Sequence, residues 1–267
     1  MLRDITIGQY YPAKSVIHQL DPRVKLMATL IYIISLFSFQ GIVGFLLVTA
    51  FLILIIRLSK VPFSYMVKGL RAIVILMLIT ALFNLFLTPG EDVLLQIWKL
   101  TITMEGVKNA VFMMVRLVYL IVGTSVMTLT TTPNQLTDGL EKSLMPLRKI
   151  HVPVHAIAMM MSIALRFIPI LIEETDIIMK AQMARGADFE NGNLIKRAKS
   201  MVPLLVPLFI SAFRRADDLA MAMEARCYVG GEGRTRMKPL SYDKRDYTAY
   251  LVLVMFLVLV ILARIIL

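Results

Sequence analysis

The residues of this chain best suited to bind a partner are two arginines, each at the end of an expected helix. They stand in two matching tripeptides, Ala184, Arg185 and Gly186, and Ala225, Arg226 and Cys227. In both copies another alanine lies three residues before the first one, so one face of each helix end carries only methyl groups. A guanidinium presents up to five N–H donors in a rigid fork. Such a helix end suits a groove that is lined by carboxylates or carbonyls.

Helix capping is a simpler explanation for a single copy of this tripeptide. Arginine in a last helical turn complements the helix dipole, and glycine after it is an ordinary left-handed cap. Capping alone explains less well why two copies occur at the ends of two consecutive long helices. The repeated pattern therefore indicates that both ends dock to a partner.

Other reactive side chains do not form a convincing catalytic or metal site. His151 and His155 have the four-residue spacing of two ligands on a helix, but Pro153 lies between them and no acidic or cysteine partner is near. The single cysteine excludes an internal disulfide and a multi-cysteine metal site. No glycine-rich phosphate loop with a Lys-Ser or Lys-Thr ending is present. We therefore predict no catalytic residue, no metal ligand and no bound cofactor in this chain.

The composition indicates an integral membrane protein. Of the 267 residues, 58% are hydrophobic and only 18% are charged, and the mean hydropathy is +0.75. A soluble domain cannot easily bury that much apolar surface. The net charge of +11 is spread over several segments. This distribution favours basic residues that flank membrane spans over a nucleic-acid-binding surface.

Five transmembrane helices are expected. Leu26 to Ile56 is a run of 31 residues without a charge, and a single helix of that length would exceed the hydrocarbon core of about 30 Å. Gly41 and Gly44 in the middle of this run predict a tight hairpin between two spans. The expected spans are residues 23–39, 42–57, 70–87, 108–130 and 247–263, and the segment 88–106 is an external loop.

The basic residues predict the orientation of these spans. Segments 1–25 and 57–71 each carry four Lys or Arg residues, and the hairpin places both on one side of the membrane. The positive-inside tendency then puts the N-terminus in the cytoplasm and the C-terminus outside. The chain divides into a membrane domain, 1–130, a cytoplasmic module, 131–246, and a final transmembrane helix, 247–267. The module holds 17 basic and 13 acidic residues.

The cytoplasmic module reads as three helices, of which two are long. They are expected at about 134–147, 154–185 and 201–228, the last one entered through Pro203 and Pro207. Gly186 is the predicted left-handed stop of the middle helix, and Pro169 is expected to kink it. Neither long helix is expected to be a span, because both have charged second halves.

The first half of helix 154–185 is apolar nearly all round, so it is expected to be buried on several sides or to lie at the membrane interface. It contains Met159, Met160 and Met161. Methionine can repack against different partners, so this run is either a contact surface for another subunit or core packing. Both readings stay open.

One charged residue, Arg116, falls inside an expected span. A charge in lipid is by default a candidate for function. Pairing with a polar group of a neighbouring helix, such as Asn84, or snorkelling to the interface would also account for it.

At the two tripeptides the sequence resembles the transmembrane T component of energy-coupling factor (ECF) transporters, relatives of ABC transporters that import vitamins and metals. The segment SIALRFIPILIEETDIIMKAQMARG (162–186) and the early LDPRVKL (20–26) are also similar to segments of this family. The resemblance covers essentially the whole chain. It implies an all-α polytopic membrane fold with a module of long coupling helices between spans four and five. It further implies a non-catalytic subunit.

The resemblance also implies partners and roles for the two tripeptides. The partners are two ABC-type ATPase subunits, which bind ATP and magnesium, and a small membrane subunit that captures the substrate. Arg185 and Arg226 would each enter a groove on one ATPase subunit, and the alanines before them would let the helices seat closely. Gly186 would end the first helix, and Cys227 occupies a position where the family varies. The methionine run would suit contact with the capture subunit.

Two other classes of protein compete with this reading. A permease of an ordinary ABC importer pairs with an ATPase through one short coupling helix and lines the substrate path itself. Two docking ends per chain and few polar residues in the spans argue against it. A membrane-embedded enzyme acting on lipids would need clustered Asp, His or Glu at a membrane boundary, and no such cluster is convincing. The sequence does not identify a transported substrate.

Overall fold

The computed structural model describes residues 10–39, 41–89, 93–97, 100–187, 189, 193–230 and 239–266. The chain forms two compact units. The bundle unit comprises residues 8–142 and 240–267, and the helix-pair unit is built on Ser143–Pro239. This division follows the packing of the chain. The division by position in the membrane, at 130/131 and 246/247, stays a prediction.

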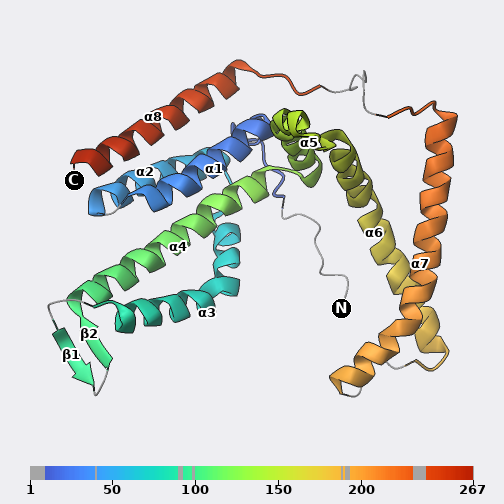
Figure 1. The fold of residues 1–267 in the computed structure, drawn as a ribbon, viewed down its shortest axis with the longest axis horizontal. Helices are drawn as coiled ribbons and strands as arrows, with labels where there is room; N and C mark the ends of the chain where they lie inside the picture. Colours follow the sequence, from blue (N-terminus) through green and yellow to red (C-terminus); the bar gives the residue numbers. More distant parts are fainter. Residues whose placement is uncertain are drawn as a thin grey trace. The chain divides into compact units, whose positions relative to one another are not determined.

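The bundle unit consists mainly of helices (Figure 1). They are α1 (Pro22–Ser38), α2 (Ile42–Ser59), α3 (Phe63–Leu87), α4 (Met104–Thr130), most of α5 (Pro133–Leu144), and α8 (Lys244–Ile266). Helices α1 and α2 each contact α4 and α8, and α3 lies along α4. A cluster of buried apolar side chains fills the space between α1, α2, α4 and α8 and includes Tyr32, Leu36, Val48, Val122, Val126, Phe256 and Val260.

The hairpin predicted within residues 26–56 is confirmed. Helix α1 ends at Ser38, and Gly41 precedes α2 with a φ of +120°, a value that favours glycine. The ring of Phe39 folds over the start of α2, where a Cβ added to Gly44 would overlap the Cδ2 atom of this ring. A larger residue at position 44 would therefore push this ring out of the turn.

The helices that could cross a membrane differ in part from the expected five. Within the described residues, four helices are long and apolar enough, namely α2, α4, α6 and α8, and the bent α3 makes a fifth if its two halves form one span. Helix α1 has only 17 residues. Helix α6 (Val154–Ala184), expected to be too charged for a span, qualifies because its apolar half is long enough by itself. Length and composition do not show that it crosses a membrane.

The segment expected to be an external loop contains a small antiparallel sheet. Strands β1 (Val93–Ile97) and β2 (Leu100–Thr103) pair with each other. Thr103 then caps α4, because its Oγ1 accepts a hydrogen bond of 3.1 Å from the N–H of Gly106. This cap explains why α4 begins at Met104, four residues before the expected start of the span.

The helix-pair unit contains the two long helices of the module. After a short 3₁₀ helix, Met145–Ile150, come α6 and α7 (Leu194–Ala225). The two helices run in opposite directions and cross each other (Figure 1). The predicted bounds of α6 are confirmed to within one residue. The structure assigns α6 as one helix through Pro169, and the expected kink stays a prediction.

The predicted start of the last module helix is wrong. Helix α7 begins at Leu194, and Pro203 and Pro207 lie inside it. Each proline lacks the N–H that would bond the carbonyl four residues before it, so the helix continues with two backbone bonds fewer. The segment between Gly186 and Ser200 is mostly polar and had suggested a loop, but its last part, 194–200, includes good helix formers. The helix also ends at Ala225, three residues before the predicted end.

Candidate docking site at two helix ends

The end of α6 is a tight hydrogen-bonded turn that leaves Arg185 at its tip. The N–H of Gly186 donates to the carbonyl of Met183, and the N–H of Ala187 donates to the carbonyl of Gln182, both at 3.0 Å. These two bonds define a Schellman motif, in which the residue after the cap is left-handed. Gly186 has a φ of +89°, so its predicted role as the helix stop is confirmed.

The end of α7 repeats this turn bond for bond. The N–H of Cys227 donates to the carbonyl of Glu224 at 2.8 Å, and the N–H of Tyr228 donates to the carbonyl of Met223 at 3.0 Å. Arg226 therefore occupies the same cap position as Arg185, with a φ of −95° against −88°. Cys227 takes the left-handed position with a φ of +54°.

The turn thus requires a left-handed backbone conformation at the third residue of each tripeptide. Cysteine in a left-handed conformation is strained by about 1–2 kcal/mol relative to an ordinary helical one. Glycine avoids that strain. The sequence contained no signal for a left-handed cysteine, and only the position-by-position match with the first copy could have indicated it.

Both tripeptides lie on the surface of the helix-pair unit. All six residues are exposed, as are the alanines three residues before them, Ala181 and Ala222. Within the part of the chain that the structure describes, neither guanidinium has a hydrogen bond or an ion-pair partner. Both cationic ends and the smooth alanine faces beside them are therefore available to another subunit.

A polar contact between α6 and α7 braces the pair where they cross. Glu174 on α6 accepts a hydrogen bond from the hydroxyl of Ser211 on α7. Its other oxygen pairs with the Nη2 of Arg215 at 3.0 Å and accepts a second bond from the Nε at 3.2 Å. Apolar side chains line the groove next to this contact, among them Ile163, Phe167, Leu171, Ala216, Leu219 and Met223.

This contact is the same number of residues away from each of the two Ala-Arg ends. Positions 174 and 185 are eleven residues apart, and so are positions 215 and 226. At about 1.5 Å per residue each arm is about 16 Å long. Because the helices run in opposite directions, the C-terminal ends of α6 and α7, which precede Arg185 and Arg226, lie at opposite ends of the pair (Figure 1).

The apolar half of α6 is largely exposed in this chain. Met160 and Met161 are 60% and 41% exposed, and only Val154 and Ala158 are buried. Of the two expectations for this half, burial on several sides is not met within the chain by itself, and a position at the membrane interface stays a prediction. The methionine run was expected to be either core packing or a contact surface for another subunit. Met160 and Met161 do not form core packing within this chain. Their exposure leaves an apolar surface for lipid or another subunit.

Comparison with known proteins shows the family of the chain. A family model described as a cobalt transport protein, CbiQ, matches residues 13–237. A protein of Clostridium kluyveri named energy-coupling factor transporter transmembrane protein EcfT is 58% identical over 266 residues, which is 99% of this chain and 98% of that protein. The chain belongs to the family of ECF transporter transmembrane components. Relatives with the same name in Thermosediminibacter oceani and Bacillus subtilis are 56% and 45% identical over 94% and 99% of this chain, and over 94% and 100% of their own lengths.

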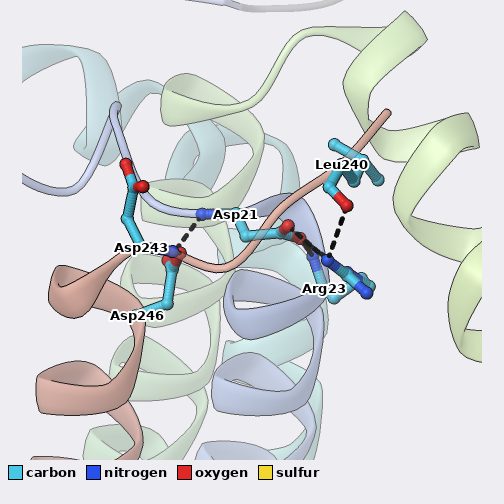
Figure 2. Close-up of polar contacts among 5 residues, drawn as sticks. All are labelled: Asp21, Arg23, Leu240, Asp243 and Asp246. Carbon is cyan, nitrogen blue, oxygen red and sulfur yellow. Dashed lines mark hydrogen bonds and ion pairs between the residues drawn. The ribbon is translucent and has the colours of Figure 1, made fainter. Parts of the chain in front are cut away.

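This member of the ECF family is a multi-pass membrane protein. A polar network in its bundle unit was not predicted from the sequence. Figure 2 shows the carboxylate of Asp246, at the start of α8, beside the start of α1. It accepts a hydrogen bond of 2.8 Å from the backbone N–H of Asp21 and one of 2.8 Å from that of Asp243. Asp21 in turn caps α1 and pairs with Arg23 at 2.8 Å, and Arg23 also donates to the carbonyl of Leu240 at 3.5 Å.

This network, which we call the α1–α8 clasp, ties the returning chain to the first helix. Asp21 and Asp246 are only 6% and 2% exposed, so their hydrogen bonds are protected from water. The two residues are 225 positions apart in the sequence. The segment LDPRVKL (20–26), which resembles a segment of the family, supplies Asp21 and Arg23, the clasp residues at the start of α1.

Arg116 has a structural partner in the bundle unit. Its Nη2 donates a hydrogen bond of 3.1 Å to the carbonyl of Phe39, which follows the last residue of α1. The suggested partner Asn84 instead donates to the carbonyl of Thr80 on its own helix. A cation at the C-terminal end of a helix satisfies an orphan carbonyl and complements the dipole. Arg116 therefore stabilises the α1–α2 turn.

Proposed function

We propose that this chain is the coupling subunit of an ECF-type importer. It passes the ATP-driven motion of two ATPase subunits to a small membrane subunit that captures the substrate. The observation that carries this proposal is the pair of exposed Ala-Arg ends, which share one turn geometry and lie at opposite ends of a braced helix pair.

Each end would dock to one ATPase subunit. Ala184 and Ala225 present no side chain beyond a methyl group, so the helix can approach a groove closely. The guanidinium then reaches groups that accept hydrogen bonds, and a carboxylate there would pair with it in bidentate geometry. Because the two ends share one geometry, they would fit the same groove on two similar ATPase subunits.

The helix pair would then act as a lever. The ATPases approach each other when they bind ATP and part after hydrolysis, so the two docked ends are moved relative to each other. The Glu174–Arg215 contact lies midway between the two ends and would serve as the pivot. Movement of the arms would change the crossing angle of α6 and α7. Such a change requires that the helix pair can adopt two arrangements. The nucleotide bound to the ATPases would shift the equilibrium between them.

The capture subunit would sit on the apolar surface of the helix pair and the spans. Met160 and Met161 belong to this surface, with Met159 beside them. Reorientation of the capture subunit by the lever would open its site to the cytoplasm. In this account the chain catalyses nothing, binds no cofactor itself, and has its N-terminus and helix pair in the cytoplasm and its C-terminus outside. The cargo is a vitamin or another micronutrient.

The test is a double charge reversal, Arg185→Glu with Arg226→Glu, in the full transporter. We expect loss of ATPase copurification from native membranes and loss of uptake, with normal membrane insertion. Arg214→Glu is the matched control, because Arg214 is also an exposed arginine of α7. Normal ATPase binding by the double variant would refute the proposal. The same purification distinguishes a conventional permease, which would appear as a dimer without a capture subunit.

A further inference from the structure

The bundle unit contains an apolar cavity that the coupling function does not use. It has a volume of about 250 Å³ and lies between α1, α2, α4 and α8. Its inner wall is formed by buried side chains, among them Tyr32, Leu52, Val126 and Leu253. An engineered apolar cavity of about 150 Å³ already binds benzene, so a site of this size and polarity takes a hydrocarbon group.

The cavity opens sideways between α2 and α8. Leu54 and Leu58 on α2 line it and are 48% and 44% exposed, and Val252 on α8 lines it and is 37% exposed. The rings of Phe51 and Phe256 stack with centroids 4.0 Å apart and close the gap between these helices at the far end. In a membrane, the open side would face lipid chains.

Two basic side chains line the other end of the cavity, and the clasp carboxylates Asp21 and Asp246 lie near one of them, Lys25. Arg245, in the first turn of α8, lines the cavity and is exposed. Its Nη1 donates to the side-chain carbonyl of Gln19, a neutral acceptor. Lys25 also lines the cavity, and its Nζ donates to the carbonyls of Thr130 and His18 at 2.8 and 3.2 Å. No carboxylate is among the described lining residues.

We propose that this cavity binds one acyl chain of an anionic phospholipid, with the lipid phosphate at Arg245. A transmembrane helix of another subunit is about 10 Å wide and does not fit a space of this volume. A segment of a single hydrocarbon chain fits and can enter from the side. Arginine binds phosphate in bidentate geometry, which fixes the headgroup at the mouth. Anionic lipids are also attracted to basic residues near the membrane surface.

The first experiment measures lipid binding to the full-length chain purified in detergent. Native mass spectrometry with added phosphatidylglycerol should show one retained lipid, and added phosphatidylcholine should be retained much less. Arg245→Gln should weaken the retention of phosphatidylglycerol about fivefold, the contribution of one cation near the surface. Lys244→Gln is the control, because Lys244 is the exposed neighbour outside the cavity. Equal losses in the two variants would overturn the proposal.

The second experiment fills the cavity. Ala249 lines it, whereas Leu251 on the same helix is 68% exposed and lies outside it. Ala249→Trp should abolish retention of phosphatidylglycerol, and Leu251→Trp should leave it unchanged. Retention of the lipid by Ala249→Trp at the level of Leu251→Trp would show that it binds elsewhere. Neither experiment involves an ATPase, so both outcomes are independent of the proposed coupling function.

Discussion

The end of α6 and the end of α7 fold into the same hydrogen-bonded turn, yet glycine takes the left-handed position in one and cysteine in the other. The two residues that point to a partner, Ala and Arg, are identical in the two copies. The residue that the backbone constrains is the one that differs. The two ends therefore share the same surface residues and differ in the strain of the turn. This pattern is expected if the two ends have to fit similar grooves.

Single charge reversals give the largest expected effect and test whether the ends are equivalent. Arg185→Glu and Arg226→Glu should each weaken ATPase docking at least about tenfold, since loss of one partner of a buried charge pair at an interface costs about 2 kcal/mol or more. Copurification of the ATPases with each single variant measures this loss. If one reversal had no effect, only one end would be a docking site and the comparison between them would fail.

Breaking the pivot should have an intermediate effect that spares docking. Glu174→Gln keeps the size of the side chain but removes the ion pair with Arg215. This pair is partly exposed, so its loss should cost no more than about 1 kcal/mol of stability. We expect uptake to fall several-fold while ATPase copurification is unchanged. Glu173→Gln, at the neighbouring position, is the control. An equal fall of uptake in both variants would contradict a special role for the Glu174–Arg215 contact.

The smallest expected effects come from exchanging the left-handed residues. Gly186→Ala should destabilise the end of α6, and Cys227→Gly should stabilise the end of α7, each by about 1 kcal/mol. Amide hydrogen exchange of residues 182–187 and 223–228 measures this as a change of about fivefold in opposite directions. Space is no obstacle at Gly186, since an added Cβ meets nothing within 4 Å. Changes of the same sign would show that backbone strain is not the difference between the two turns.

Local signals predicted much of the fold. The charge-free run with Gly41 in its middle predicted the α1–α2 hairpin, and Gly186 predicted the end of α6. These predictions worked because glycine carries its conformational preference with it. Cys227 has no such preference, so only its match with Gly186 in the other copy could have indicated its left-handed φ. Pro203 and Pro207 led to the wrong predicted start of α7. Proline is a local helix breaker, but the long helix continues through both residues.

Long-range contacts were beyond the sequence. The α1–α8 clasp joins Asp21 to Asp246 across 225 positions, and no local pattern relates them. The midpoint position of the Glu174–Arg215 contact likewise depends on how α6 and α7 pack. The two tripeptides themselves were found because they repeat, and repetition is visible without a structure.

The movement of the two docking ends is the central claim, and a distance measurement tests it most directly. Spin labels at Met183→Cys and Glu224→Cys would sit on exposed residues beside the two arginines, with Cys227→Gly removing the single native cysteine. Pulsed electron paramagnetic resonance on the full transporter would compare nucleotide-free and ATP-bound states. The lever account predicts a shift of the label-to-label distance on ATP binding. An identical distance distribution in the two states would contradict it.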